Sequence, residues 1–325
     1  MMKGPSITEA PSTVGATYVD PSITRLLEPG EKIDKLFTRN STQEYVLQRL
    51  TEHTYWYQGQ YYGTIFYVGE SGVLLFDALD GQGESIKKAI ASVTSLPLTA
   101  IVYSHAHADH IGDANTFTEG GAIQRIIASK ATAEKMDFLK SSLPAPTETV
   151  AWPQGSFKFE GLTVELHGFE RASHCDDHGV WLLVEEKVAH LPDLVNPDQL
   201  PFWAFAGSEN FVYYEANVEQ LGSLDWTYLS GGHGNVGDKA DIEFYRSFLS
   251  DLKQAVGQAM GEVEWGTGVD ADKVNAHTAF LPAWFDAIAR NATDALRPKY
   301  GNYYGFEMAT PRNAEMVADA MLSYR

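Results

Sequence analysis

The sequence predicts a mixed α/β protein, and three patterns support this class. Short apolar runs alternate with helix-like segments from Thr54 to about residue 140, and hairpin-linked strands follow to about residue 192. Beyond Gly237 the chain becomes helical. The 325 residues, 44% of them hydrophobic, suffice for one large core. We therefore expect an N-terminal arm over 1–45, a central domain over 46–240 and a C-terminal helical region over 241–325 that packs on it.

The first half of the chain predicts an arm followed by strands and helices. Residues 1–40 are rich in Ser, Thr, Pro and Gly and are expected to dock as an arm, not to form core. From Thr54, TYWYQGQYYGTIFYVG and GVLLFD predict two β runs joined by a Glu-Ser-Gly turn. The next elements are a helix over 84–95, strands over 99–104 and 122–129, a helix in ATAEKMDFLKSS, and strands in SFKFE, LTVELHGF, GVWLLVEE and KVAHL.

The C-terminal region predicts one long helix in ADIEFYRSFLSDLKQAVGQAM and shorter helices near 283–296 and 311–324. Apolar residues recur at helical spacing along the long helix and form one stripe: Ile242, Tyr245, Phe248, Leu249, Leu252, Val256 and Met260. We expect this stripe to pack on the core, with oligomerisation through these helices as the alternative.

Composition limits the partners of the protein. With 24 Lys and Arg against 43 Asp and Glu, the formal net charge of −19 repels phosphate backbones and anionic membrane surfaces. The single cysteine, Cys175, cannot form an intrachain disulfide, and no segment is apolar enough for a signal sequence or a membrane span. We expect a soluble cytoplasmic protein that acts on a small molecule and binds neither nucleic acid nor membrane.

The segment IVYSHAHADHIGD carries most of the candidate chemistry. It places His105, His107, Asp109 and His110 within six residues, directly after an apolar strand. Alternate residues of an extended segment point the same way, so His105 and His107 can share one metal, while Asp109 and His110 can face a second. Strand ends are also where open α/β sheets place ligands.

Three further residues at strand-to-loop transitions could complete two metal shells. His174 precedes the strand GVWLLV, and Asp193 follows the strand in KVAHL. His233 lies in GGHG, whose glycines let the backbone approach a crowded site.

In order and type, these motifs resemble the metallo-β-lactamase superfamily over about residues 50–240. The resemblance implies a four-layer αβ/βα sandwich with the site at one edge of two facing sheets, and a buried aspartate, Asp77, after an early strand. It assigns His105, His107 and His174 to one metal, Asp109, His110 and His233 to the other, and Asp193 to both as a bridging carboxylate.

Two divalent ions follow from this ligand set, with zinc as the default for His and Asp ligands and iron or manganese as alternatives. A water molecule that bridges two such ions has a lowered pKa and can attack as hydroxide at neutral pH. We expect Asp109 to orient this hydroxide or to pass its proton to the leaving group.

Other residues near these motifs have weaker support. The loop after Asp193 is rich in aromatic residues, and either Tyr213 or Tyr214 could donate to an oxyanion. His178 could compete with His174 as a ligand, and Cys175 could bind metal or only pack. His277 is a weaker candidate from the helical region.

Departures from particular branches of the superfamily narrow the reaction. True β-lactamases with this histidine box generally lack the bridging aspartate, whereas glyoxalase II-like thioesterases and lactonases retain all seven ligands. The resemblance therefore implies a dinuclear hydrolase of a lactone, ester or thioester. The alternatives are β-lactam or phosphodiester hydrolysis at the same site, a mononuclear iron dioxygenase of the same fold, and a non-catalytic binding module.

Overall fold

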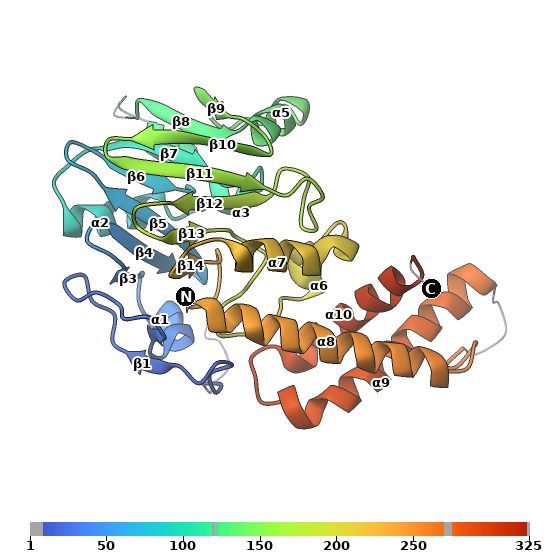
Figure 1. Cartoon of the computed structure of the whole chain (residues 1–325). Helices are drawn as coiled ribbons and strands as arrows, with labels where there is room; N and C mark the ends of the chain where they lie inside the picture. Colours follow the sequence, from blue (N-terminus) through green and yellow to red (C-terminus); the bar gives the residue numbers. More distant parts are fainter. Residues whose placement is uncertain (1–8, 119–120, 122, 270–274, 324–325) are drawn as a thin grey trace.

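The protein is built around two facing β-sheets with helices on their outer faces (Figure 1). A computed structural model describes residues 9–118, 121, 123–269 and 275–323. One sheet has seven strands in sequential order: β3 (Val46–Arg49), β4 (Thr54–Gly59), β5 (Tyr62–Val68), β6 (Val73–Phe76), β7 (Leu98–Tyr103), β8 (Arg125–Ser129) and β9 (Glu148–Val150). The other has six, also in order: β10 (Gln154–Phe159), β11 (Leu162–Gly168), β12 (Gly179–Leu183), β13 (Val188–His190), β14 (Tyr228–Ser230) and β15 (Val236–Gly237).

Side-chain alternation along the strands separates the layers. In β6, Leu74 and Phe76 belong to the core between the sheets, whereas Val73 and Leu75 belong to the core under the outer helices. All four are fully buried, as expected for a strand covered on both faces. In β12, Trp181 likewise faces the opposite sheet, and Val180 faces the helices beyond.

Helices cover both outer faces and complete four layers. The seven-stranded sheet is covered by α2 (Gly83–Val93), α3 (Ala108–Ile111), α4 (Ala114–Thr118) and α5 (Lys130–Phe138). The six-stranded sheet is covered by α7 (Tyr214–Ser223) and α8 (Lys239–Glu262), with the short segments α6 (Ala204–Gly207) and η1 (Phe211–Tyr213) before them. The four-layer αβ/βα sandwich predicted from the sequence is confirmed.

The C-terminal helices pack beneath this layer and extend away from the sheets (Figure 1). They are η2 (Ala276–Phe280), α9 (Leu281–Tyr300) and α10 (Phe306–Met321). The apolar stripe of α8 is buried within this one chain, because α7, α9 and α10 contact α8. Among the described helices, none combines the length and the apolar character that a membrane span needs.

The N-terminal segment contributes to the core, which differs from the expectation of a docked arm alone. It forms two parallel strands, β1 (Thr17–Val19) and β2 (Glu31–Ile33), and the helix α1 (Leu36–Thr42). Leu27 and Ile33 are buried in the core between the sheets. The pattern of Ser, Pro and Gly concealed this role because only isolated apolar residues of the segment reach the core.

The first predicted β run is two strands, because a tight turn divides it. Gln60 and Tyr61 both have positive φ, 49° and 70°, and connect β4 to β5. A two-residue turn of this kind matches the twist of the flanking strands. The turn brings Tyr61 and Tyr62 next to the GGHG loop, where Gly63 N donates to Gly232 O at 2.6 Å.

Candidate metal centre

The histidine-rich segment begins where β7 ends and is held by a buried aspartate. Asp77 follows β6 in a left-handed conformation, with φ of 56°, and one of its carboxylate oxygens accepts the backbone N–H of Ser104 at 2.7 Å. Its other oxygen lies 2.9 Å from His190 Nε2. The carboxylate therefore fixes the start of the loop that carries His105 and His107.

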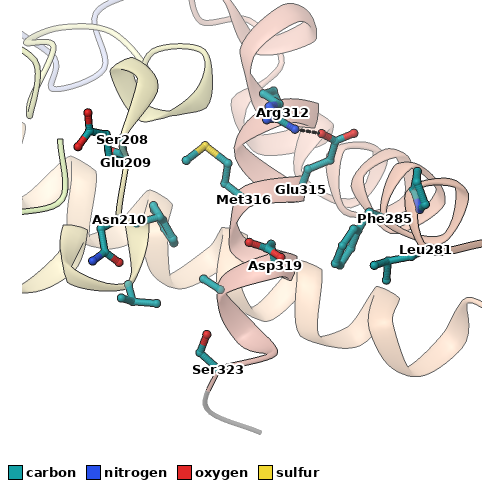
Figure 2. A pocket seen from close by; sticks show the side chains of 14 residues that line it. Ser208, Glu209, Asn210, Leu281, Phe285, Arg312, Glu315, Met316, Asp319 and Ser323 are labelled. Atoms are coloured by element: carbon teal, nitrogen blue, oxygen red, sulfur yellow. Dashed lines mark hydrogen bonds and ion pairs between the residues drawn. The ribbon is translucent and has the colours of Figure 1, made fainter. Parts of the chain in front are cut away.

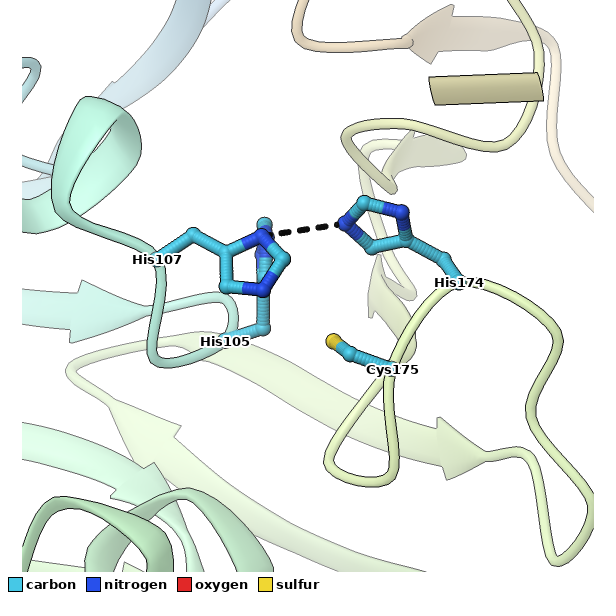
Figure 3. A group of neighbouring side chains, drawn as sticks. All are labelled: His105, His107, His174 and Cys175. Atoms are coloured by element: carbon cyan, nitrogen blue, oxygen red, sulfur yellow. Dashed lines mark hydrogen bonds between the residues drawn. The ribbon is translucent and has the colours of Figure 1, made fainter. Parts of the chain in front are cut away.

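One group of possible ligands combines this loop with the loop before β12 (Figure 3). One ligand atom from each of His105, His107, His174 and Cys175 lies within 4.8 Å of the others. His107 Nδ1 and His174 Nε2 face each other at 3.1 Å. Cys175 projects from the same loop as His174 (Figure 3).

A second group contains Asp109, His110, Asp193 and His233, again within 4.8 Å of one another. Asp193 also reaches the first group. Its Oδ2 lies 3.0 Å from His110 Nε2, 3.4 Å from His174 Nε2 and 3.6 Å from His105 Nε2. Its Oδ1 lies 3.3 Å from His233 Nε2. The Asp193 carboxylate thus lies between the two groups of side chains.

Backbone geometry holds Asp193 in this central place. Its φ is 66°, and its N–H donates to Gly231 O at 3.1 Å, next to the loop of His233. The buried hydroxyl of Tyr214 donates to the carbonyl of Leu194, the following residue. Strained backbone that the surroundings hold in place is frequent at functional sites.

The free nitrogen atoms of the cluster suit metal ions. His233 Nδ1 is 3.0 Å from the carbonyl of Tyr61 and must donate to it, which leaves Nε2 with a lone pair toward Asp193. Among the described residues, His105 Nε2 is buried and has no hydrogen-bond partner. Buried nitrogens without partners are costly, and divalent ions would satisfy them.

The charge balance of the cluster leads to the same conclusion. Burial and the neighbouring histidines lower the pKa of His174 to about 3, so its ring is neutral. Burial also lowers the pKa of His110, but the Asp193 carboxylate outweighs it and raises the pKa to about 9. The buried carboxylate thus attracts positive charge, which a divalent ion would supply in place of the proton on His110, and the neutral ring of His174 is in the form that ligates metal.

An ion pair behind the first group connects its two loops. Asp177, 1% exposed, accepts the backbone N–H of Ala106 at 2.7 Å and binds Lys135 Nζ at 2.9 Å. Cys175 Sγ donates to the same carboxylate at 3.3 Å. Burial raises the pKa of the Cys175 thiol, so it is protonated in this arrangement.

The remaining candidates from the sequence lie around this cluster. His178 is buried against His174 and His105, but its Nε2 donates to Pro192 O at 2.6 Å. Tyr213 is partly buried, with the Arg171 guanidinium 5.6 Å from its ring centre. His277 is exposed in η2.

Tyr62 is a neighbour of the site that sequence reasoning missed. Its ring centre lies 4.5 Å from that of His233 and 6.0 Å from that of His110. Burial, and then the carboxylates of Asp109 and Asp193, raise the pKa of Tyr62, so its hydroxyl stays protonated. No local signal marks Tyr62, because only the turn at Gln60 and Tyr61 brings it to the site.

Two cavities lie near the ligand loops. The larger, about 600 Å³, lies between α10, the start of α9 and the segment 208–212 (Figure 2). That segment is tied to the first group, because the backbone N–H of Glu209 donates to His174 O at 3.2 Å. The smaller cavity, about 180 Å³, is lined in part by Phe202 and His233.

Comparisons with known proteins agree with the fold. The sequence pattern of the family described as "Metallo-beta-lactamase superfamily" matches residues 59–233. The structure resembles a metallo-β-lactamase from Pontibacter korlensis, with a TM-score of 0.54, 17% identity, and coverage of 63% of this chain and 99% of that one. It also resembles metallo-β-lactamase IND-7, with a TM-score of 0.55, 19% identity, and coverage of 64% and 99%. None of the curated proteins compared with this chain matches its sequence.

A two-sheet sandwich with histidine and aspartate groups gathered at the ends of its strands defines a metal-dependent hydrolase fold. The chain belongs to the metallo-β-lactamase superfamily, because the family match spans more than half of its length. The fold implies binding of divalent metal, and members of the superfamily are generally hydrolases.

Proposed function

We propose that the protein is a dinuclear metal-dependent hydrolase of a lactone, ester or thioester. The observation that carries this proposal is the position of Asp193, whose two oxygens reach histidines of both groups. A mononuclear iron oxygenase would need only one of these groups, whereas the chain provides two.

The residues that would hold the ions are the predicted ones. His105, His107 and His174 would hold one ion, Asp109, His110 and His233 the other, and Asp193 would contact both. Zinc is the first choice for this donor set, with iron or manganese as alternatives. When bound, such ions supply a water molecule of lowered pKa and a Lewis acid for the substrate oxygen.

The side chains around the ions have separate tasks in this proposal. Asp109, whose side chain is 45% exposed, orients the attacking water and takes its proton to the leaving group. Tyr62, protonated and beside His233, donates a hydrogen bond to the substrate oxygen.

The two tyrosines of the aromatic loop have different positions. Tyr214 already donates its hydroxyl hydrogen to Leu194 O, so we assign it the positioning of Asp193. Tyr213 remains the alternative to Tyr62 as the residue that donates to the oxyanion. The variants Tyr62→Phe and Tyr213→Phe distinguish them. Only the variant that removes the true donor should lower kcat, by roughly 10²- to 10³-fold.

The test of the reaction is acid release measured at constant pH. The panel contains lactones, esters, thioesters, β-lactams and phosphodiesters, offered to the zinc-loaded protein and to its His105→Ala variant. We expect release from a lactone, ester or thioester by the unaltered protein alone. Release confined to β-lactams or phosphodiesters, or silence across the panel, contradicts the proposal.

A further inference from the structure

We propose that the cavity beside His233 binds a short, uncharged acyl chain of the substrate, and that the N-terminal helix α1 forms one of its walls. This inference rests on the proposed hydrolase function. It adds a substrate class, namely esters or lactones with a small apolar acyl part, and a specificity role for a segment outside the family match at 59–233.

The cavity lies beside the candidate metal centre and shares His233 with it. His233 lines it, and the same ring faces Asp193 through Nε2. Phe202 packs edge-on against this ring, with 4.7 Å between ring centres, and forms a second wall. We therefore place the acyl part of a substrate whose carbonyl lies at the ions past His233, in this space.

The apolar parts of the cavity wall come from distant parts of the chain. Leu36 and Phe37 of α1 face it, together with Tyr61 of the β4–β5 turn. Phe37 contacts Tyr61, at 5.0 Å between ring centres, and stacks on Tyr304 at 5.4 Å. The N-terminal segment, the hairpin and the C-terminal region thus fix the position of Phe37 jointly.

The polar groups of the cavity favour an uncharged ligand. None of its described lining residues is Asp, Glu, Lys or Arg, in a chain of formal net charge −19. The amides of Asn40 and Gln58 bind each other at 2.7 Å and satisfy backbone groups around them. A charged group placed there would lose part of its hydration without gaining a partner ion among the lining residues.

One polar group remains available to a ligand. Gln199 accepts the Asn196 side-chain amide through Oε1 at 2.9 Å, and its own Nε2 has no hydrogen-bond partner among the described residues. It can donate to a neutral oxygen on the chain, such as a keto or hydroxyl group. The volume of about 180 Å³ lies below the range of roughly 300–1,000 Å³ typical of small-molecule pockets, which suits a short chain and not a fatty acyl chain.

The experiment compares hydrolysis of p-nitrophenyl esters from acetate to decanoate by the zinc-loaded protein. We expect kcat/KM to rise by about fourfold per methylene until the cavity is full, and then to fall. The mono-ester of adipate, which carries a terminal carboxylate, should react about tenfold or more slowly than the hexanoate ester.

Variants of Phe37 test whether this cavity causes the dependence on chain length. Phe37 also lines the adjoining cavity of about 230 Å³, so Phe37→Ala should join the two and move the preferred chain length upward. Phe37→Trp should move it downward. Phe138, 82% exposed on α5, provides the matched controls Phe138→Ala and Phe138→Trp, which should keep the original profile.

The outcomes separate this inference from the proposed function. A profile that is flat, or unchanged in both Phe37 variants, or equal for the charged and neutral esters, overturns the inference while hydrolysis itself stands. If no ester, lactone or thioester is hydrolysed, the proposed function fails, and binding of hexanamide by saturation-transfer NMR then decides on the cavity. Binding that Phe37→Trp abolishes supports the site, and no binding to the unaltered protein refutes it.

Discussion

Lys135 Nζ lies 2.9 Å from the carboxylate of Asp177, whose other oxygen holds the backbone N–H of Ala106 between His105 and His107. A residue of α5 thus supports the position of both metal-binding candidates on the loop after β7. Neither charge is a proposed ligand, so their contribution can be measured without removing one.

Substitution of Asp177 tests this support. Asp177→Asn leaves Lys135 without its buried partner and weakens the bond to Ala106, so we expect a loss of about 3 kcal/mol in the free energy of unfolding. Asp176→Asn is the matched control, because Asp176 also contacts Lys135, at 2.7 Å, but its side chain is 77% exposed. Urea denaturation of the metal-free proteins measures both, and equal losses would contradict the role of Asp177.

The pH dependence of this effect has a definite sign. Burial by itself raises the pKa of Asp177, but the hydrogen bond and charge of Lys135 outweigh it and hold the pKa below its usual value. A depressed pKa stabilises the fold above the unfolded value of about 3.9, and this contribution is lost as the pH falls below it. The difference between the unaltered protein and Asp177→Asn should therefore be full at pH 6 and shrink as the pH falls below about 4 and through the depressed pKa of Asp177. A difference that grows on acidification would show the opposite sign.

Metal stoichiometry tests the two ligand groups. The unaltered protein should bind two zinc ions per chain, measured by mass spectrometry of the dialysed protein, and His105→Ala should retain about one and lose hydrolysis. His277→Ala is the control, because His277 is exposed in η2, and it should keep both ions. Two tightly held ions in His105→Ala would refute the assignment.

A left-handed turn beside the site provides a test of strain. The segment α6 has positive φ at Ala204, Phe205 and Ala206, and the buried Asn313 of α10 accepts the N–H of Phe205 at 3.2 Å. Because a left-handed conformation costs roughly 1–2 kcal/mol for a residue with a side chain, Ala206→Gly should stabilise the fold by about 1 kcal/mol.

The control for this change is an alanine in an ordinary helix. Ala91 is exposed in α2, where glycine should destabilise by roughly 0.5–1 kcal/mol. If the urea midpoints of Ala206→Gly and Ala91→Gly move in the same direction, the backbone at Ala206 is not strained.

The buried pair of Lys32 and Asp241 tests the attachment of the N-terminal segment. Both side chains are 1% exposed or less and lie 2.7 Å apart. Lys32→Met leaves a buried carboxylate unpaired and should cost roughly 3–5 kcal/mol, while adding Asp241→Asn should recover part of that loss. Lys130→Met, at an exposed pair with Glu134, should change little. If the double variant loses as much free energy of unfolding as the two single variants together, Lys32 and Asp241 are not coupled.

Local sequence patterns were sufficient to predict the structure around a residue where its surroundings follow from its neighbours in sequence. Alternating burial in strands such as β6 and the 3.6-residue stripe of α8 predicted the layers, because each pattern follows from the repeat of the backbone itself. The candidate ligands of the histidine box also lie on one short segment after β7, with His105 and His107 in the loop and Asp109 and His110 in α3, which follows directly from their spacing.

By itself, the sequence determined the α/β class, the resemblance to its superfamily and the residue types available for metal. Only the tertiary structure decided that Tyr62 borders the site, that Phe37 lines the cavity beside His233, and that Lys135 supports the loop of His105 and His107. The physical reason is distance along the chain. Contacts such as that of Phe37 with Tyr304 depend on how the layers pack against one another, and no local periodicity records that packing.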